Sequence, residues 1–219
     1  MAPIDDLVRA AALAASPTPG AARAALDSLP WLIDAIAADR AAGLFALWGS
    51  STVVDENTGE AVIPEPLFAA LHEQAGIEAT WPIGNAGLLH TYGYLLSLAP
   101  TPYGLKRERW LGTELAGALG LDPAHFLPWV EGPTLLARAT EAATALFEAA
   151  EFAWYAPVGG RATRTALGAE RGGARGLAYA VAPAPGHPPL LVTMFPVADA
   201  TALRRELDEA SARLRWNAA

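Results

Sequence analysis

The chain lacks cysteine and lacks any long run of apolar residues. The absence of cysteine excludes disulfide bonds, thiolate metal sites and a cysteine nucleophile. No stretch reaches the 18 or so apolar residues that a transmembrane helix needs, so the membrane is not an expected partner. The first residues, Met1 to Asp6, carry acid where a signal peptide needs basic residues. We therefore expect a cytoplasmic protein.

Positive charge is also scarce. The 219 residues include 15 basic and 23 acidic side chains, with a formal net charge of −8. Surfaces that bind nucleic acid are normally basic, so nucleic acid is not an expected partner. Charged residues make up 17% of the chain and apolar residues 53%, which predicts a buried core rather than disorder. The low charge and the seven tryptophans are also compatible with a homo- or hetero-oligomer, in which another subunit covers apolar surface.

Motifs for cofactors and metals are missing as well. The chain has no phosphate-binding glycine loop, no dinucleotide fingerprint and no Gly-x-Ser-x-Gly elbow. Its histidines lack metal-ligand spacing. The segment Asp55-x-Asn57-x-Gly59 has the opening of a calcium loop without the closing glutamate, so it predicts a turn. We expect no cofactor and no metal, which leaves acid/base and electrostatic catalysis.

The patterns that are present predict an α+β fold, with helices first and an antiparallel sheet last. Helices are predicted over residues 5–14, 20–28, 30–41, 64–74, 85–98, 102–119 and 133–151. A β-hairpin insertion is predicted from residues 44–54 and 61–63. Four strands and a closing helix are predicted over residues 152–158, 161–167, 177–182, 190–197 and 199–214. The length suits a single domain, residues 1–219, or a helical region of residues 1–151 joined to a sheet region of residues 152–219.

Lysine is nearly absent: Lys106 is the single lysine beside 14 arginines. A composition rich in Ala, Gly, Pro and Arg is typical of a high-GC bacterial genome, in which lysine codons drift toward arginine. The pKa of a lysine moves readily on burial, whereas arginine stays charged, so Lys106 is the first candidate for chemistry. Arg107 and Arg109 beside it would depress its pKa, which suits a Schiff base.

The helix predicted from Asn85 to about Leu98 carries a polar stripe. His90, Tyr94 and Ser97 are spaced i, i+4 and i+7 and therefore share a face, while leucines on both sides predict burial. His90 could act as general acid or base with Tyr94 as proton donor, and Ser97 could bind substrate. The alternative is a core histidine bonded to a neighbouring carbonyl or tyrosine.

Basic residues gather in the first turns of the next predicted helix, which Thr101 would cap. Free backbone amides, the helix dipole and cationic side chains together make an anion site. The alternative is a solvated face with weak ion pairs. The predicted substrate-binding residues here are Tyr103, Arg107, Arg109 and Trp110, with Lys106 among them.

A third group combines arginine with glycine between the predicted strands. These glycines are explained by hairpin loops, although Arg164 or Arg175 could clamp a substrate carboxylate. The group consists of Arg161, Arg164, Arg171 and Arg175.

Three functions follow from these residues. The first is a small cofactor-independent enzyme of the cyclase, lyase or hydrolase type that acts on an anionic small molecule, in bacterial specialised metabolism. The second is a non-catalytic binding or partner subunit. The third comes from the last third of the chain, whose helix beside antiparallel strands resembles the layout of compact microbial ribonucleases, although the acidic charge opposes RNA binding.

Overall fold

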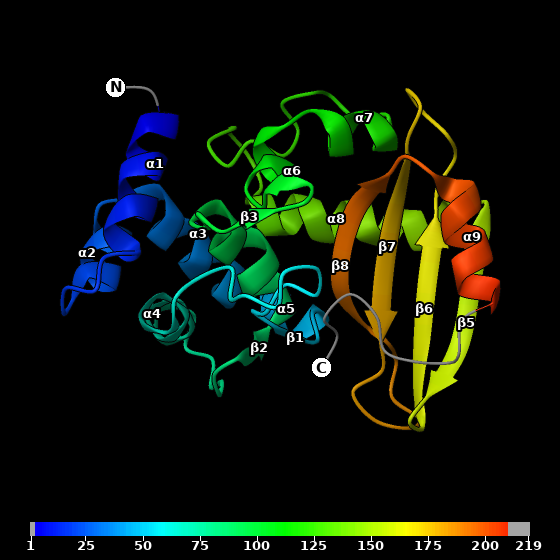
Figure 1. The fold of residues 1–219 in the computed structure, drawn as a ribbon, viewed down its shortest axis with the longest axis horizontal. Helices are drawn as coiled ribbons and strands as arrows, with labels where there is room; N and C mark the ends of the chain where they lie inside the picture. Colours follow the sequence, from blue (N-terminus) through cyan, green and yellow to red (C-terminus); the bar gives the residue numbers. More distant parts are fainter. Residues whose placement is uncertain (1–2, 210–219) are drawn as a thin grey trace.

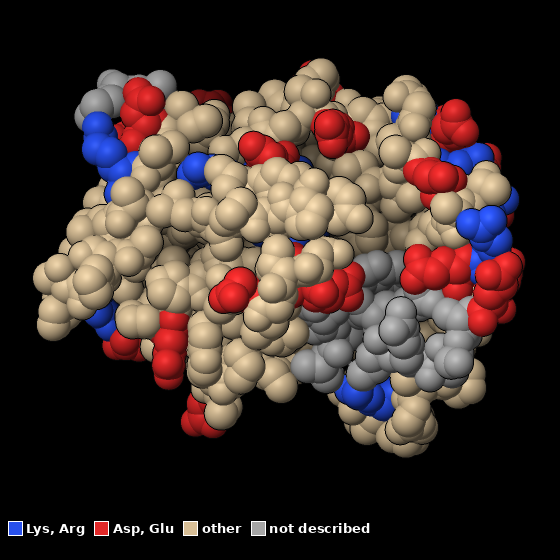
Figure 2. All heavy atoms as spheres, in the orientation of Figure 1, with Lys and Arg blue, Asp and Glu red and all other residues tan. Residues whose placement is uncertain are grey.

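The computed structural model describes residues 3–209. The fold is α+β, as predicted: helices and small hairpins form the N-terminal region of the chain, and a four-stranded antiparallel sheet forms the C-terminal region. In Figure 1 the sheet stands at one end of the molecule and α1 lies at the other. On the face drawn in Figure 2, uncharged atoms cover most of the surface, and acidic and basic groups lie scattered among them.

Most of the predicted helices form close to their expected bounds. Helix α4 ends at Gly76, whose φ of 65° provides the left-handed cap that glycine adopts easily. Helix α8 begins at Thr134, whose side chain accepts a hydrogen bond from the backbone N–H of Ala137. These helices are α1 (Pro3–Ala14), α2 (Ala21–Asp27), α3 (Pro30–Ala41), α4 (Glu65–Ala75) and α8 (Leu135–Ala149).

The C-terminal sheet is a meander in which each strand pairs with the next. Helix α8 packs against the inner strands, and Arg204 of α9 (Ala200–Glu209) stacks on Phe152 at the sheet. The predicted last helix continued to residue 214, but the positions after 209 lie outside the described residues. The strands are β5 (Phe152–Val158), β6 (Arg161–Leu167), β7 (Arg175–Val181) and β8 (Leu190–Val197).

The predicted hairpin insertion forms only at its turn. Val54 and Ala61 make one antiparallel bridge across it, but residues 44–47 form the 3₁₀ helix η1 (Leu44–Leu47). Strand β1 (Ser50–Thr52) pairs instead with β2 (Ile83–Asn85), a partner that is distant in the sequence.

A buried strand must satisfy its backbone groups, and this requirement explains the change of partner. Gly49 N–H donates to Leu191 O at 2.8 Å, and Ala86 N–H donates to Gly49 O at 2.8 Å. Residues 48–52 therefore lie between β2 on one side and β8 on the other.

The polar helix begins as predicted, with the Asn85 side chain accepting from Leu88 N–H at 3.0 Å. It starts as α5 (Ala86–Leu88), widens into the π-helix η2 (Leu89–Gly93) and ends a few residues before the predicted Leu98. Ser97 thus lies beyond the helix, in the core and fully buried.

The prediction of a single helix over residues 102–119 is wrong. Pro102 favours extended backbone at Thr101, whose hydroxyl donates to Gly104 O at 2.7 Å and closes a turn instead of capping a helix. Gly104, at a φ of 86°, completes a hairpin, and the following helix is interrupted at Gly112. The observed elements are β3 (Pro100–Thr101), β4 (Gly104–Leu105), α6 (Glu108–Leu111) and α7 (Glu114–Leu119). Lys106 therefore precedes a helix of one turn, not the long helix on whose N-terminus the predicted anion site depended.

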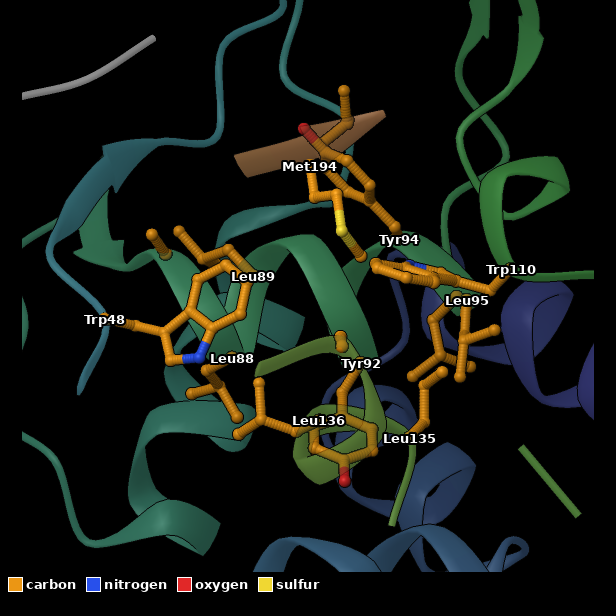
Figure 3. Packing of buried hydrophobic residues seen from close by; sticks show 14 of the residues in the cluster. Trp48, Leu88, Leu89, Tyr92, Tyr94, Leu95, Trp110, Leu135, Leu136 and Met194 are labelled. Carbon is orange, nitrogen blue, oxygen red and sulfur yellow. The ribbon is translucent and has the colours of Figure 1, made fainter. Parts of the chain in front are cut away.

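One hydrophobic cluster runs from Leu7 of α1 to Leu207 of α9. Figure 3 shows its centre, where Tyr92 and Leu95 of the polar helix pack among side chains of α8, with Trp48 to one side. Between residues 3 and 209, no helix has the length and apolar character needed to cross a bilayer.

Candidate functional site

Several residues that the sequence singled out converge on the ring of Tyr94. The ring centroids of His90 and Tyr94 are 4.8 Å apart. Lys106 Nζ lies 5.5 Å and the Arg109 guanidinium 5.0 Å from the Tyr94 centroid. We call His90, Tyr94, Lys106 and Arg109, with their partners Ser51, Asp55 and Thr193, the Tyr94 cluster.

Both ring nitrogens of His90 have hydrogen-bond partners. Nδ1 lies 2.6 Å from Val192 O, and Nε2 lies 3.0 Å from Ser51 Oγ. A carbonyl oxygen only accepts, so Nδ1 carries the proton and Nε2 accepts from the serine hydroxyl. Trp110 Nε1–H donates to His90 O at 2.7 Å. His90 thereby joins β1, the polar helix, α6 and β8. This arrangement matches the alternative given above, in which His90 is a core histidine bonded to a neighbouring carbonyl.

Burial decides the protonation of the ring groups in this cluster. Burial, helped by the charge of Arg109, lowers the pKa of His90 to about 3, so the ring is neutral at pH 7. Burial raises the pKa of Tyr94 to about 12. A base with a pKa near 3 accepts a proton poorly at neutral pH, and a phenol with a pKa near 12 donates one poorly.

Lys106 forms an ion pair with Asp55, whose side chain is 1% exposed. Asp55 Oδ1 also accepts from the backbone N–H of Asn57 at 2.9 Å and of Thr58 at 3.2 Å, so the turn predicted here forms around this carboxylate. Burial alone would raise the pKa of Asp55, but the hydrogen bond and the charge of Lys106, together with the hydrogen bonds from Asn57, outweigh it and hold this pKa below its usual value. The single lysine thus neutralises a buried acid.

Arg109 reaches from α6 to the sheet. Its Nη1 donates to Thr193 Oγ1 at 3.0 Å, and its guanidinium lies between the rings of Tyr94 and Phe195, 5.8 Å from the Phe195 centroid. Burial lowers the pKa of Arg109. This arginine therefore packs β8 against the polar helix.

The remaining predicted site residues are dispersed. Trp110 is 1% exposed and belongs to the core, and Ser97 is fully buried, with no hydrogen-bond partner for its Oγ among residues 3–209. Tyr103 is 82% exposed at the tip of the β3–β4 hairpin, away from the buried members of the set. Arg107 stands at the start of α6, and part of its guanidinium is buried. The structure thus brings His90, Tyr94, Lys106 and Arg109 together; His90 and Tyr94 are buried, whereas Lys106 and Arg109 are partly exposed.

The candidate carboxylate clamps of the sheet are occupied within the chain. Arg175 pairs with Glu151 and, at 3.9 Å, with Glu170. Arg164 lies over Phe147 and Tyr155. The remaining strand arginine of the group, Arg161, is not free of partners either.

Arg161 lines an open cleft of about 640 Å³, the larger of two hollows that stand out among the described residues. The floor of this cleft is the segment 48–50 together with Val192. One wall is formed by residues 77–85, and the other by Arg161, residues 181–183 and Leu190. Because residues 48–52 lie between β2 and β8, the two walls rise on opposite sides of this floor.

The cleft is mainly apolar with few charges. Trp81 stands half-buried on the first wall, edge-on to Phe68 with ring centroids 5.4 Å apart, and Ile83 beside it is 45% exposed. Sequence reasoning missed this site, although its residues include a Trp-Pro pair and one arginine of the third group. The cleft depends on the placement of residues 48–52 between β2 and β8, which only the fold reveals.

No family model, no curated protein and no solved structure matches this chain.

Metal chemistry has no ready ligand set in the described region of the chain. Among residues 3–209, no group of three or more histidine, aspartate or glutamate side chains is arranged to hold a metal ion. Two candidate functional sites are therefore left: the largely buried Tyr94 cluster and the open cleft.

Proposed function

We propose that this protein binds an anionic small molecule in the cleft and does no chemistry on it. The observation that carries the proposal is the open cleft of about 640 Å³, which is lined mostly by apolar residues. Ligand sites in proteins are usually clefts of roughly 300–1,000 Å³ with apolar walls and a few polar groups. An arginine offers a planar pair of donors that fits a carboxylate or phosphate.

The burial of His90 and Ser51 in the Tyr94 cluster favours binding over catalysis. His90 is 2% exposed and Ser51 is fully buried, so a substrate has no path to either side chain in this conformation. Successive residues of a strand point to opposite faces, and accordingly Ser50 lines the cleft while Ser51 bonds to His90 in the core. A lysine that donates to a buried carboxylate is not the free amine that a Schiff base requires.

A calorimetric titration tests the binding proposal. Small carboxylates and phosphate monoesters with apolar groups are first screened by thermal shift, and the tightest probe is then titrated into wild type and Arg161→Gln. We expect about tenfold weaker binding to the variant, because a charge-assisted hydrogen bond contributes about 1.5 kcal/mol or more. Arg171→Gln, an exposed arginine outside the cleft, is the matched control. Equal affinities in wild type and Arg161→Gln would place the ligand elsewhere.

The predicted enzyme, of the cyclase, lyase or hydrolase type, is the second candidate, and one observation favours it. Ser51 Oγ, His90 Nε2 and Val192 O form a hydrogen-bonded series, with a carbonyl in the orienting position that a carboxylate holds in a catalytic triad. A fluorophosphonate probe tests this candidate. Covalent labelling of Ser51 in the folded protein, absent in Ser51→Ala, would support a hydrolase, whereas an unlabelled Ser51 would leave the pair a structural one.

The cytoplasmic location and the oligomeric state belong to the same proposal. Cell fractionation tests the first. Light scattering of the purified chain across concentrations tests the second, and a monomer at every concentration would count against a homo-oligomer.

A further inference from the structure

Strand β5 is the outer edge of the C-terminal sheet. The sheet order is β5-β6-β7-β8, so β5 pairs with β6 on one side and with no other described strand. Figure 1 shows β5 as the outermost strand, at the end of the molecule opposite α1. An unpaired edge of this kind is a template for another strand, and proteins that stay monomeric usually protect it with charges, prolines or bulges.

The direction of the free backbone groups follows from the bonds of the neighbouring strand. Ala162 O accepts from Ala182 N–H at 2.8 Å, so even-numbered residues of β6 bond toward β7 and odd-numbered ones toward β5. In the register of the β5–β6 hairpin, those odd-numbered residues lie opposite the even-numbered residues of β5. Ala153, Tyr155 and Pro157 therefore direct their backbone groups away from β6, and of these only Pro157 lacks an N–H.

Protection of this edge is slight. No charged residue lies between Phe152 and Val158, and the register with β6 runs without a bulge. Glu151, just before the strand, is paired with Arg175. Pro157 blocks only the end of the edge beside the β5–β6 turn. Because a chain with a net charge of −8 repels a second copy, an uncharged edge is where two copies approach at the least electrostatic cost.

We propose that β5 pairs antiparallel with β5 of a second copy of this chain, with Trp154 on the two-fold axis. In this register Ala153 lies opposite Tyr155 of the second copy, and the two residues exchange two backbone hydrogen bonds. The axis repeats both bonds. Phe152 lies opposite Ala156 of the second copy, so each of these aromatic side chains meets an alanine. Trp154 meets its own copy on the same face as Phe152.

The order of large and small side chains makes β5 complementary to itself in this register. A register centred on Tyr155 would place Pro157, which has no N–H, opposite Ala153 and would lose backbone bonds. Tyr155 is 61% exposed, and its hydroxyl accepts from Arg164 Nη2 at 3.3 Å. The Arg164 guanidinium also lies 5.3 Å from the centroid of the tyrosine ring. A side chain already held in place loses little conformational freedom when a partner covers it.

The interface is small. A standard specific interface buries about 800 Å² on each partner, and a single strand pair with its side chains falls short of this. We therefore expect a weak, reversible dimer that forms as the concentration rises. This dimer specifies the homo-oligomer of the proposed function, and ligand binding in the cleft does not depend on it.

Sedimentation of the full chain across concentrations tests the dimer. Wild type should shift from monomer to dimer. Ala153→Lys should weaken the association about tenfold, because a lysine protects an edge and the axis repeats each unfavourable cross-strand pair. Ala162→Lys, at an exposed alanine of the neighbouring strand, is the matched control and should associate as wild type does.

The outcomes separate the interface from the proposed function. A wild type that stays monomeric would overturn the β5 dimer and the homo-oligomer but not ligand binding in the cleft. A dimer that tolerates Ala153→Lys would overturn β5 as the interface and leave the homo-oligomer in place.

Cysteine crosslinking tests the register and does not depend on the lysine variant. The chain has no cysteine, so introduced cysteines supply the only thiols. Under mild oxidation, a mixture of Ala153→Cys and Tyr155→Cys should form more crosslinked dimer than either variant alone, because opposite residues of an antiparallel pair lie about 5.5 Å apart at their Cα atoms. More crosslinking of Tyr155→Cys alone than of the mixture would put Tyr155 on the axis and overturn this register. Equal crosslinking in all three samples would overturn the strand pairing.

Discussion

The Tyr94 cluster and the cleft lie on the two sides of one short strand. Ser51 points from β1 into the cluster and bonds to His90, whereas its neighbour Ser50 lines the cleft. The cluster holds residue types that enzymes use, yet the ring nitrogens of His90 and the ammonium of Lys106 are already bonded within the protein. The cleft holds few such types but is open. Access to solvent therefore identifies a candidate site better than residue type does.

The two regions also differ in what they contribute to stability. Bonds to His90 join segments that are 20, 39 and 102 residues away along the chain. Removal of one partner from such a buried network leaves other polar groups unsatisfied. Substitutions at the rim of the cleft leave few polar groups unsatisfied, because water can replace the lost contact. Substitutions in the cluster should thus affect folding, and those in the cleft should affect binding.

The largest effect is expected at Lys106. Lys106→Met leaves the buried carboxylate of Asp55 without its cation and should lower the free energy of unfolding by about 3 kcal/mol. The double variant Asp55→Asn, Lys106→Met should recover most of this loss, because an asparagine oxygen still accepts from Asn57 and Thr58 N–H. Urea unfolding measures both. A stable single variant would mean that the ion pair is dispensable and would weaken the contrast between the two regions.

The next largest effect is the pH dependence that His90 imposes. The ordinary histidine pKa is 6.5, and in the folded chain burial lowers the pKa of His90 to about 3. Between these values the unfolded chain binds a proton that the folded chain does not, so stability falls as pH falls, by about 2 kcal/mol at pH 5. Unfolding curves at pH 7 and pH 5 should show this loss in wild type and a smaller one in His90→Gln. His187→Gln, at an exposed loop position, should behave as wild type.

A smaller effect is expected where the cluster helix supports the floor of the cleft. A Cβ at Gly87 would lie 2.6 Å from Trp48 Cγ, in the middle of a ring that cannot swing away. Gly87→Ala should therefore cost about 1.5 kcal/mol through overpacking and should also weaken ligand binding. Gly117→Ala is the matched control, since a Cβ there has no neighbour within 4 Å, and it should stabilise α7 slightly. Equal melting temperatures of the two variants would contradict the packing argument.

The smallest effect on folding is expected at the wall of the cleft. Ile83 is 45% exposed, and Ile83→Thr keeps a β-branched residue in β2. The free energy of unfolding should change by less than about 0.5 kcal/mol. The affinity for the tightest probe of the calorimetric titration should nevertheless fall, because apolar contact surface is lost. A variant that unfolds readily but binds normally would reverse the roles given to the two regions.

Prediction from the sequence succeeded where local signals agree. The four strands and α8 are flanked by glycine, proline or a threonine cap, and they form within a few residues of their predicted bounds. The helix predicted over residues 102–119 failed because the turn around Gly104, tied by the Thr101 hydroxyl, outweighs the helical pattern that follows it. The i, i+4 spacing did place His90 beside Tyr94, and this contact survives the widening of the helix at η2.

By itself the sequence determined the fold class, the absence of disulfides and the grouping of His90 with Tyr94, because each depends on composition or on short spacings. The tertiary structure alone decided that β1 pairs with β2, that Asp55 receives Lys106, and that Val192 and Ser51 bond to His90. These partners come from distant segments, and local propensity carries no information about which of them will meet. The burial of His90 and Tyr94, and the presence of an open cleft beside them, follow from these tertiary contacts.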